Sequence, residues 1–296
     1  MTDETTPFII ESFGSVDDFL SSTEDFRATE PVLTNVIGSI AAGVQAGRVY
    51  DTCLLMAVRD GEGTVVGCAA LTSPWNLVVS PMPRGAALAL GRHMADTHPD
   101  MPGITGVRDV VNAVVESLGL DYEPRIAMVD TVRVIDEFVP PAREIPGSPR
   151  RADDADRDRL IAWLIQFGLD ASLPLHDVES SVDSRLDARA FWFWEVDGRP
   201  VALAGHAPVV PTPAGNVGRI GPVYTPEAER GHGYAAAITS VVVRHLQPQC
   251  SVIMLYADAT NPTSNGVYDR LGFRAAAEVI EIELASAPDD FDNHFH

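Results

Sequence analysis

The sequence is poor in cysteine and lacks any apolar run long enough to cross a membrane. Its three cysteines, Cys53, Cys68 and Cys250, are an odd number without the spacing of a metal site, so we expect buried thiols in a reducing cytoplasm. No apolar run approaches the roughly 18–20 residues that a membrane span needs. The acidic N-terminal segment MTDETT does not resemble a secretory signal. These absences favour a cytoplasmic localisation.

Positive charge is also scarce. The chain has 21 Lys plus Arg against 42 Asp plus Glu, which gives a formal net charge of −21. A field of this sign repels nucleic acid and anionic membranes and favours a cationic acceptor such as an amine. Solubility or adaptation to salt would explain the same excess. The charge therefore excludes nucleic acid and membrane partners more than it identifies a partner.

The chain has the length and the apolar content of two domains. It has 296 residues, of which 46% are hydrophobic, enough for two ordinary cores. Proline and glycine cluster between residues 140 and 149, which is typical of a linker. Residues 151–157 look like the charged start of a helix. We therefore divide the chain into domains 1–145 and 146–296.

The two halves show the same order of predicted elements. The second half has a helix at 160–167, strands at 190–196, 200–208 and 218–225, a helix at 236–246, a strand at 251–257, a helix at 262–271 and a strand at 279–284. The first half has strands at 54–59, 64–71 and 76–80, a helix that begins near Arg84, and a closing strand at 125–138. This order indicates two copies of one α/β unit.

The most informative stretch is the run Arg-Gly-His-Gly-Tyr-Ala at residues 230–235. It follows the strand near 219–225 and opens the helix at 236–246. The first turn of a helix has unpaired N–H groups and a partial positive charge. Gly231 and Gly233 lack the Cβ atoms that would keep an anion away from those groups. This run therefore predicts a site for a phosphorylated cofactor.

A second motif lies at residues 261–273, from Asn261 through Tyr268 to Gly272-Phe273. Together the two motifs resemble the GNAT superfamily of acyl-CoA-dependent N-acyltransferases. That family has the pattern Arg/Gln-x-x-Gly-x-Gly/Ala, then an Asn at a strand end, a helix, a Tyr and Gly-Phe. The close resemblance covers about residues 219–284. It implies an α/β (α+β) fold of two GNAT-like units, each with a mixed, splayed central sheet flanked by helices.

The resemblance also implies a cofactor site without a metal, in which acetyl-CoA is the co-substrate. Backbone groups of residues 223–225 would pair with the pantetheine arm as an added strand does. The amides of residues 230–235 would hold the pyrophosphate. The residues that it places at the cofactor are Val223, Tyr224, Thr225, Arg230, Gly231, His232, Gly233, Tyr234, Ala235, Asn261, Ser264 and Tyr268.

Three of these residues also have purely structural interpretations. Asn261 before Pro262 suits a helix N-cap with proline at the first helical position, which is compatible with a place beside the cofactor. Arg230 is either a charge near the pyrophosphate or a surface residue at a helix end. In the family, Tyr268 protonates the CoA thiolate as it leaves, and the alternative is a core tyrosine packed with Leu271.

The run Arg84–Ala89 aligns with Arg230–Ala235, and Ser117–Leu120 aligns with Arg270–Phe273. Within this alignment the first half departs from the family pattern. Ala87 replaces Gly233, Arg108 replaces Asn261 and Val115 replaces Tyr268. Ala87 adds a Cβ inside the proposed cradle, and Val115 cannot donate a proton. We therefore expect a degenerate first copy that shapes the acceptor pocket or stabilises the second, as occurs in tandem members of the superfamily.

The acceptor amine must lose a proton before or during attack, so we expect a general base on the strands near the cleft. The candidates for this base are Glu195, His206 and Asp258. We predict that Glu195, as the base, and Tyr268, as the acid, are the catalytic residues. Each also has a structural interpretation. Glu195 would face solvent on its strand, His206 would be a core histidine whose hydrogen bonds are satisfied, and Asp258 would order a loop or cap a helix.

Aromatic side chains suggest the border of an acceptor pocket. In the strand at 191–194, Phe191 and Phe193 should face one side and Trp192 and Trp194 the other. We expect core packing for one face, whereas the other face lines an acceptor pocket, meets the first half of the chain or holds a cation. Weaker candidates for the same border are Trp163, Phe167, His176 and Asp177. His294 and His296 are weak candidates for metal ligands.

The leading prediction is a tandem protein whose second half transfers acetyl from acetyl-CoA to an amine by direct attack in a ternary complex, with a homodimer as one candidate assembly. A non-catalytic acyl-CoA sensor or scaffold would keep residues 230–235 without needing Tyr268. A third hypothesis is a transferase that uses a longer acyl-CoA or an aminoacyl-tRNA as donor. The negative net charge argues against an aminoacyl-tRNA donor. A dinucleotide enzyme would need Gly-x-Gly-x-x-Gly, which residues 230–235 do not have.

Overall fold

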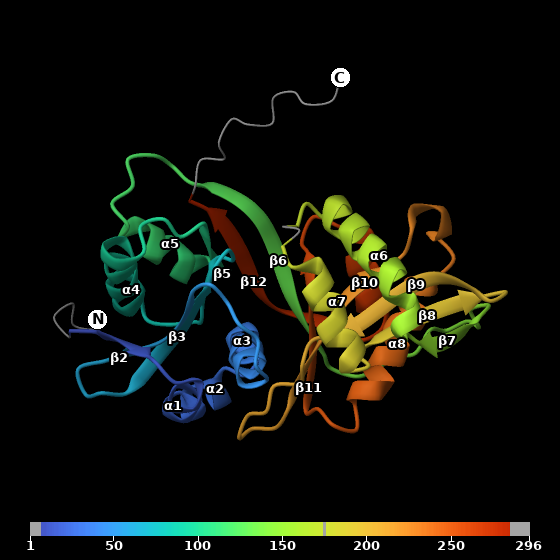
Figure 1. The fold of residues 1–296 in the computed structure, drawn as a ribbon, viewed down its shortest axis with the longest axis horizontal. Coiled ribbons are helices and arrows are strands. Elements are labelled where there is room, and N and C mark those ends of the chain that lie inside the picture. The colour runs from blue at the N-terminus through green and yellow to red at the C-terminus, as the bar shows by residue number, and fades with distance from the viewer. Residues whose placement is uncertain (1–6, 174–175, 285–296) are drawn as a thin grey trace. The chain divides into compact units, whose positions relative to one another are not determined.

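The computed structural model describes residues 7–173 and 176–284 and divides into two compact units (Figure 1). Unit 1 comprises Met1–Val129 and Glu278–His296, and unit 2 comprises Asp130–Ala277. His294 and His296, which the sequence offers as weak metal ligands, lie outside the described residues. Across the described ranges, no helix is long and apolar enough to span a membrane.

Unit 1 contains a mixed sheet with the strand order β1-β2-β3-β4-β5-β12. The β4–β5 pair is parallel, and the other pairs with a described register are antiparallel. Its elements are β1 (Ile9–Phe13), α1 (Val16–Ser22), α2 (Glu24–Thr29), α3 (Asn35–Gln45), β2 (Cys53–Arg59), β3 (Val65–Thr72), β4 (Leu77–Val79), α4 (Arg84–Thr97), β5 (Gly103–Val107), α5 (Arg108–Glu116) and part of β12 (Phe273–Glu283).

The strands of unit 2 have the order β6-β11-β10-β9-β8-β7 and are also of mixed direction. Here the parallel pair is β10 with β11. Its elements are part of β6 (Arg125–Ile135), β7 (Ser148–Arg151), α6 (Arg157–Asp170), α7 (Val178–Asp187), β8 (Phe191–Val196), β9 (Arg199–His206), β10 (Val217–Tyr224), α8 (Tyr234–Leu246), β11 (Val252–Asp258) and α9 (Pro262–Arg270).

The two units repeat one arrangement. In each, antiparallel strands lead to a strand-helix-strand-helix series, β4-α4-β5-α5 in unit 1 and β10-α8-β11-α9 in unit 2. Each sheet carries helices on both faces, since separate core clusters join it to α4 and α5, to α1 and α3, to α8 and α9, and to α6 and α7. The predicted α/β class with a mixed sheet flanked by helices is therefore confirmed.

Strand β8 shows how the sequence pattern determines the two faces of the unit 2 sheet. Phe191 and Phe193 belong to the core that includes α6 and α7, whereas Trp192 and Trp194 pack into the core that includes α8. The predicted alternation along this strand is confirmed. Both faces of β8 are core, because Trp192 is only 6% exposed and Trp194 packs against the α8 cluster.

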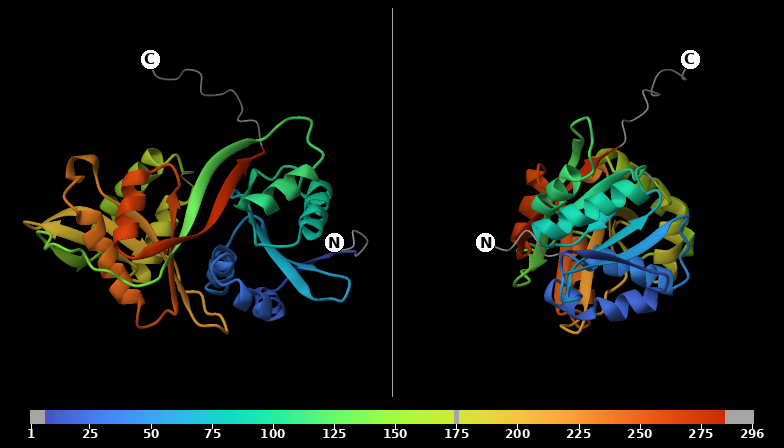
Figure 2. Two further views of the ribbon diagram at one scale, coloured as in Figure 1. Left: turned by 180° about the vertical axis from the view of Figure 1, so that it is seen from behind. Right: turned by 90° about the vertical axis from the view of Figure 1, so that its left-hand side faces the viewer.

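The two closing strands that the sequence predicts are present, and each pairs with a strand from the other half of the sequence. Strand β6 pairs with β11, from Met254↔Val134 to Asp258↔Asp130, and β12 pairs with β5. Figure 2 shows β6 as the long green arrow and β12 as the long red arrow. An alternating pattern determines that a segment is a strand and which face it buries, but the partner strand is decided by packing.

One correction concerns the segment before α6. The sequence favours a linker followed by the start of a helix at residues 151–157, but Ser148–Arg151 form strand β7, which pairs with β8. The helix α6 begins only at Arg157. Strand β7 lies at the edge of the sheet, the position where a strand can contain a proline such as Pro149. Because proline is otherwise typical of a linker, the sequence pattern did not predict this strand.

The cysteines are free thiols. Cys68 on β3 is fully buried, and burial raises its pKa to about 12, so the thiol stays protonated at neutral pH. Cys53 and Cys250 are partly buried. The prediction of buried thiols is confirmed for Cys68 and holds in part for the other two.

Gly272, which follows α9, holds that helix against the loop after β6. Its φ is +94°, and a Cβ at this position would lie 1.8 Å from the carbonyl oxygen of Glu137. The amide of Asp136 donates to the carbonyl of Gly272, and the amide of Val139 donates to that of Leu271. Gly119 follows α5 at the corresponding place in unit 1, with a φ of +72°, but a Cβ there would meet nothing within 4 Å.

The two glycines make a matched pair for a stability test. Gly119→Ala should lower the free energy of unfolding by about 1 kcal/mol, the cost of a side chain in the left-handed region. Gly272→Ala should lower it by roughly 3 kcal/mol, because the backbone at Glu137 must also move. Urea unfolding of both variants measures the difference, and equal losses would contradict the close approach at Gly272.

Candidate functional site

The parallel strands β10 and β11 separate toward their C-terminal ends. Their register runs from Val217↔Val252 to Ile220↔Leu255 and then stops. Strand β10 continues to Tyr224 in register with β9 alone, after a bulge between Ile220 and Val223. Strand β11 continues to Asp258 against β6. The side of β10 that faces β11 thus opens from residue 221 onward, which is the splayed geometry that the family resemblance implies.

The chain turns from this opening into α8 through two glycines in the left-handed region. Gly231 has a φ of +84° and Gly233, the N-cap of α8, a φ of +90°. No side chain caps the N-terminus of α8, and a Cβ on Gly231 would meet nothing within 4 Å. The first amides of α8 are therefore accessible to an anion, and the helix dipole favours one there.

Arg230 ties this turn to the end of β10 and to α6. Its Nε donates to the carbonyl oxygen of Thr225 at 3.1 Å, and its Nη2 lies 2.6 Å from Asp170 Oδ2. The interaction with Thr225 fixes the loop between β10 and α8, so Arg230 has a structural role as well as a positive charge at the turn. Next to it, the His232 ring stacks on Tyr234 at a centroid distance of 5.3 Å.

Thr225 carries an unusual buried hydroxyl. Its Oγ1 is inaccessible to solvent and has no hydrogen-bond partner within the described part of the chain. Such a group costs about 1–3 kcal/mol if nothing satisfies it, so a bound ligand would be a suitable partner. The neighbouring Tyr224 points elsewhere, since its ring packs edge-on against Trp163 and Phe167 of α6. Only the backbone of Tyr224 remains for a ligand.

Helix α9 begins as the sequence predicts. Asn261 is the N-cap, its Oδ1 accepts from the amide of Ser264 at 3.0 Å, and Pro262 takes the first helical position. This confirms the capping role of Asn261. Whether Asn261 and Ser264 also contact a cofactor is a prediction that the capping geometry neither requires nor opposes.

Tyr268 of α9 is packed as a core residue but keeps an unused hydroxyl. The side chain is 8% exposed and its ring contacts Phe273 edge-on at 6.0 Å. Its hydroxyl makes no hydrogen bond to any described residue. Burial raises the pKa of Tyr268 to about 12, and the nearby Arg133 guanidinium opposes that rise. The hydroxyl is therefore protonated at neutral pH and able to donate.

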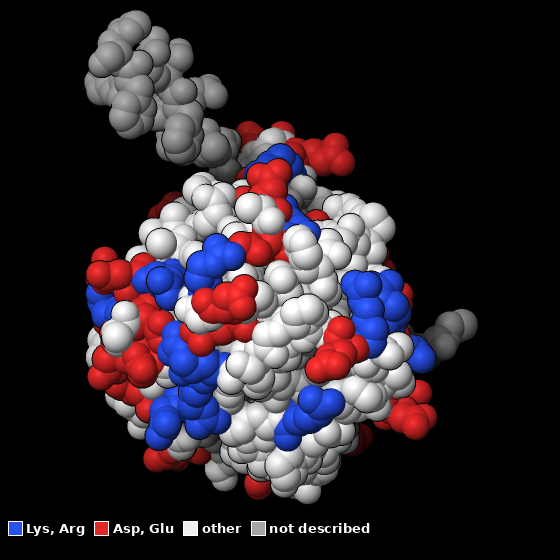
Figure 3. All heavy atoms as spheres, turned by 90° about the vertical axis from the view of Figure 1, so that its right-hand side faces the viewer, with Lys and Arg blue, Asp and Glu red and all other residues white. Residues whose placement is uncertain are grey.

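The predicted base Glu195 lies in another part of unit 2. It is on β8, which is separated from β10 by β9. Its Oε1 accepts from Arg150 Nε at 2.7 Å, and Arg150 also holds Asp156 at 2.7 Å. The Glu195 carboxylate is thus engaged in an ion pair, and its role as base stays a prediction. Figure 3 shows the same pattern on one face of the molecule, where arginines and carboxylates lie side by side around uncharged surface.

The other two base candidates have structural partners. Asp258 Oδ1 accepts from both the amide and the hydroxyl of Thr260, at 2.8 and 2.7 Å, and so orders the loop before α9. His206 is 8% exposed and donates from Nδ1 to the carbonyl of Ala207 at 2.7 Å. These contacts agree with the structural interpretation of each residue.

His206 belongs to an aromatic cluster between β8, β9 and α8. Its ring stacks on His245 at 5.5 Å, and both rings contact Trp192. Arg151 lies over Trp192, 4.6 Å from the ring centroid. Burial lowers the pKa of His206, aided by His245, Arg185 and Arg151, and burial together with Arg151 lowers the pKa of His245. Both rings are therefore neutral at neutral pH.

The counterpart in unit 1 has a different shape. Helix α4 begins at Arg84 itself, so the residues that correspond to the glycine turn are helical. Arg84 Nη2 pairs with Glu116 Oε2 at 2.7 Å, and a Cβ on Gly85 would lie 2.7 Å from the Phe8 ring. Gly85 therefore allows the start of α4 to pack closely against Phe8. The turn that could hold an anion in unit 2 thus has no equivalent here.

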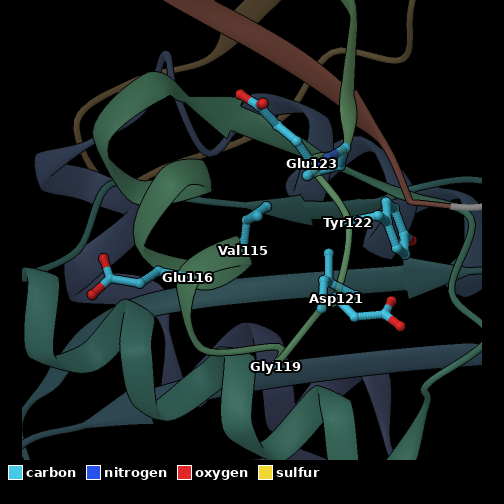
Figure 4. A pocket seen from close by; sticks show the side chains of 8 residues that line it. Val115, Glu116, Gly119, Asp121, Tyr122 and Glu123 are labelled. Carbon is cyan, nitrogen blue, oxygen red and sulfur yellow. The ribbon is translucent and has the colours of Figure 1, made fainter.

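A shallow hollow of about 530 Å³ follows α5 in unit 1, at the place that corresponds to Tyr268 and Gly272. Figure 4 shows the carboxylates of Glu116 and Asp121 pointing away from one another beside Val115. The hollow is open, and Glu116 is engaged with Arg84. The lining residues are Val115, Glu116, Gly119, Leu120, Asp121, Tyr122, Glu123 and Pro124.

Two arginines near the unit 2 site lie outside the sequence motifs. Arg143 precedes β7, and its Nη2 would lie 3.8 Å from a Cβ on Gly233. Arg133 is a buried residue of β6 that bonds α9. Both are distant from the motifs in sequence. The one available signal was a charged residue between two apolar ones, Val132-Arg133-Val134.

Comparison with known proteins gives this geometry a context. Residues 157–273 match the model of the Acetyltransferase (GNAT) family. A mycothiol acetyltransferase of Streptomyces avermitilis is 30% identical over 230 residues, which are 72% of this chain and 63% of that protein. A second mycothiol acetyltransferase, from a Parafrankia species, is 41% identical over 76 residues, 24% of either chain. The matched regions thus span less than two thirds of the length of these relatives.

Solved structures show that the fold extends over most of the chain. A GCN5-related N-acetyltransferase from Sphaerobacter thermophilus matches with a TM-score of 0.62 at 16% identity, covering 94% of this chain and 96% of that one. A tandem GNAT protein of the clavulanic acid pathway matches with a TM-score of 0.56 at 14% identity, covering 95% and 100%. These likenesses establish a GNAT fold, and the family match supports assignment of residues 157–273 to that family.

The histidine cluster predicts a pH-dependent stability. Because the pKa values of His206 and His245 are lowered by folding, the unfolded chain binds protons more readily. Stability is then complete above the unfolded value of about 6.5 and falls as the pH drops below it. Between about pH 7.5 and 5.5 we therefore expect the free energy of unfolding to fall. Urea unfolding at both values measures it. This loss of stability should be smaller in the double variant His206→Asn/His245→Asn and should persist in the control His98→Gln. An unchanged loss in the double variant would contradict the assignment to these two histidines.

Proposed function

We propose that this chain is a GNAT-type N-acetyltransferase and that unit 2 transfers an acetyl group from acetyl-CoA to an amine. One observation carries the proposal: the opening between β10 and β11 leads directly to the uncapped, glycine-flanked N-terminus of α8. An extended thioester arm and a pyrophosphate need such an opening and such a helix end together. The family match over residues 157–273 supports it.

The residues present fit acetyl-CoA. The backbone of Val223, Tyr224 and Thr225 offers donors and acceptors on the open side of β10, and the orphaned Thr225 hydroxyl offers one more. The turn Gly231–Gly233 and the first amides of α8 would hold the pyrophosphate, with positive charge from Arg230. Asn261 and Ser264 would border the cofactor from the start of α9.

The chemistry needs one proton donor and one proton acceptor. Acetyl-CoA supplies a thioester whose carbonyl carbon an amine can attack, with the CoA thiol as leaving group. As the C–N bond forms and the C–S bond breaks, Tyr268 donates its proton to the sulfur. Its high pKa keeps that proton available. The amine nitrogen gives its proton to a base or to water, and Glu195 is the predicted base.

The acceptor belongs to the amine class. The relatives named mycothiol acetyltransferase make the acceptor of those enzymes the first compound to test, followed by a broad panel of primary amines. All 21 basic residues of this chain are arginines, so acetylation of its own lysines cannot add background. Slow hydrolysis of acetyl-CoA without any acceptor would favour an acyl-CoA sensor instead.

Removal of the Tyr268 hydroxyl tests the proton donor. Tyr268→Phe should lower kcat about 100-fold or more, within the range of general acid catalysis, and should change the KM for acetyl-CoA little. Chromatographic measurement of CoA release gives both values. Tyr122→Phe in unit 1 serves as the control and should behave as the parent chain does. An unchanged kcat in Tyr268→Phe would refute the role of Tyr268.

Two buried hydroxyls without described partners provide a test of cofactor binding. Thr225→Val should weaken the binding of CoA roughly fivefold, because a hydrogen bond of about 1 kcal/mol is lost. Thr239→Val in α8 removes an equally orphaned hydroxyl and should leave CoA affinity unchanged. Isothermal titration calorimetry with CoA measures both. Equal affinities of the two variants would argue against Thr225 as a cofactor contact.

A further inference from the structure

Arg133 is a buried arginine that the family motifs do not include. It lies on β6, opposite Leu255 of β11 in an antiparallel register, and is 8% exposed. Leu255 faces the core of α8 and α9, so Arg133 projects from the sheet toward the same helices. Burial of a guanidinium is costly unless its hydrogen bonds are satisfied. The partners of Arg133 therefore indicate what the residue is for.

Both described partners of Arg133 are on α9. Nε donates to Asn265 Oδ1 at 3.0 Å, and Nη1 donates to Asp269 Oδ1 at 2.7 Å. The planar fork of the guanidinium fixes two positions of the helix one turn apart. Tyr268 lies next to Asp269 on this helix. The fork thus sets where α9 sits on the sheet.

The network continues from Asn265 to the start of α9. Asn265 Nδ2 donates to the carbonyl oxygens of Asp258 and Asn261, each at 2.9 Å. Asp258 ends β11, and Asn261 caps α9. A continuous path of hydrogen bonds therefore runs from Arg133 to the strand end that borders the opening and to the N-cap beside it.

Arg133 also places a positive charge beside the proton donor. Its guanidinium opposes the effect of burial on Tyr268 and favours the ionised phenol. A tyrosine that donates its proton acquires negative charge, and a fixed cation nearby stabilises that charge as it develops. Of the described residues, Arg133 is the one whose charge acts on Tyr268 in this way.

We propose that Arg133 is a positioning residue for acetyl transfer, which orients α9 and supports Tyr268 as the proton donor. The proposal rests on the function assigned to unit 2. Since β6 is a strand of the first sequence half, that half contributes directly to the reaction of the second.

Variants of Arg133 should fold. The Asp269 side chain is 57% exposed, so water can solvate it when its partner is removed. Asn265 keeps its two bonds to the backbone. Arg133→Met keeps an unbranched apolar stem without the guanidinium, Arg133→Lys preserves the charge without the fork, and Arg125→Met is the control on the same strand. Arg125 is 68% exposed and pairs with Glu283 in unit 1.

Kinetics in two backgrounds separate positioning from a general structural role. CoA release from acetyl-CoA is measured with the amine of the panel that supports the fastest reaction. Arg133→Met should lower kcat about tenfold, with Arg133→Lys between it and the parent chain and Arg125→Met unchanged. In the Tyr268→Phe background the same substitution should lower kcat less than twofold, because Arg133 acts through Tyr268. Equal losses in both backgrounds would overturn the proposal.

Hydrogen–deuterium exchange gives a readout that does not depend on turnover. Arg133→Met should speed the exchange of amides in residues 262–270, with or without CoA, and leave α8 unchanged; Arg125→Met should change neither. Unchanged exchange in α9 would overturn the proposal. If Tyr268→Phe itself retains full activity, the assigned proton donor fails, and the exchange data still decide whether Arg133 positions α9.

Discussion

The end of the β10–β11 register at Ile220↔Leu255 is the constraint on which the site depends. Beyond it, backbone groups of β10 face an opening instead of a neighbouring strand. Such groups need partners wherever water is excluded, and an extended ligand can supply them as an added strand would. The same divergence places the start of α8 on one side of the opening and α9 on the other, so two motifs distant in sequence serve one space.

Comparison of the two units shows what this constraint requires. Both units contain a parallel pair with a helix between the strands, but only α8 begins after a left-handed glycine turn without a side-chain cap. In unit 1 the corresponding helix starts four residues earlier in the aligned motif, at Arg84, and its arginine pairs with Glu116. The fold alone therefore does not make the site; the turn before the helix does.

Much of the local structure could be predicted from the sequence. Asn261-Pro262 specified the start of α9, because a side-chain acceptor and a residue without an N–H are what a helix N-terminus needs. The alternation at residues 191–194 specified the two faces of β8. The partners of β6 and β12 could not be predicted, since long-range pairing leaves no local pattern. For the same reason the role of Arg133 was invisible: its partners, Asn265 and Asp269, lie on a distant helix.

The central claim is that the opening beside β10 and the N-terminus of α8 together bind the acyl donor of an acetyl transfer. A crystal structure of the chain with CoA tests it most directly. The account predicts pantetheine density along Val223–Thr225, the pyrophosphate on the amides from Gly231 to Ala235, and the CoA sulfur beside the Tyr268 hydroxyl. CoA bound elsewhere, or held with its sulfur remote from Tyr268, would contradict the account.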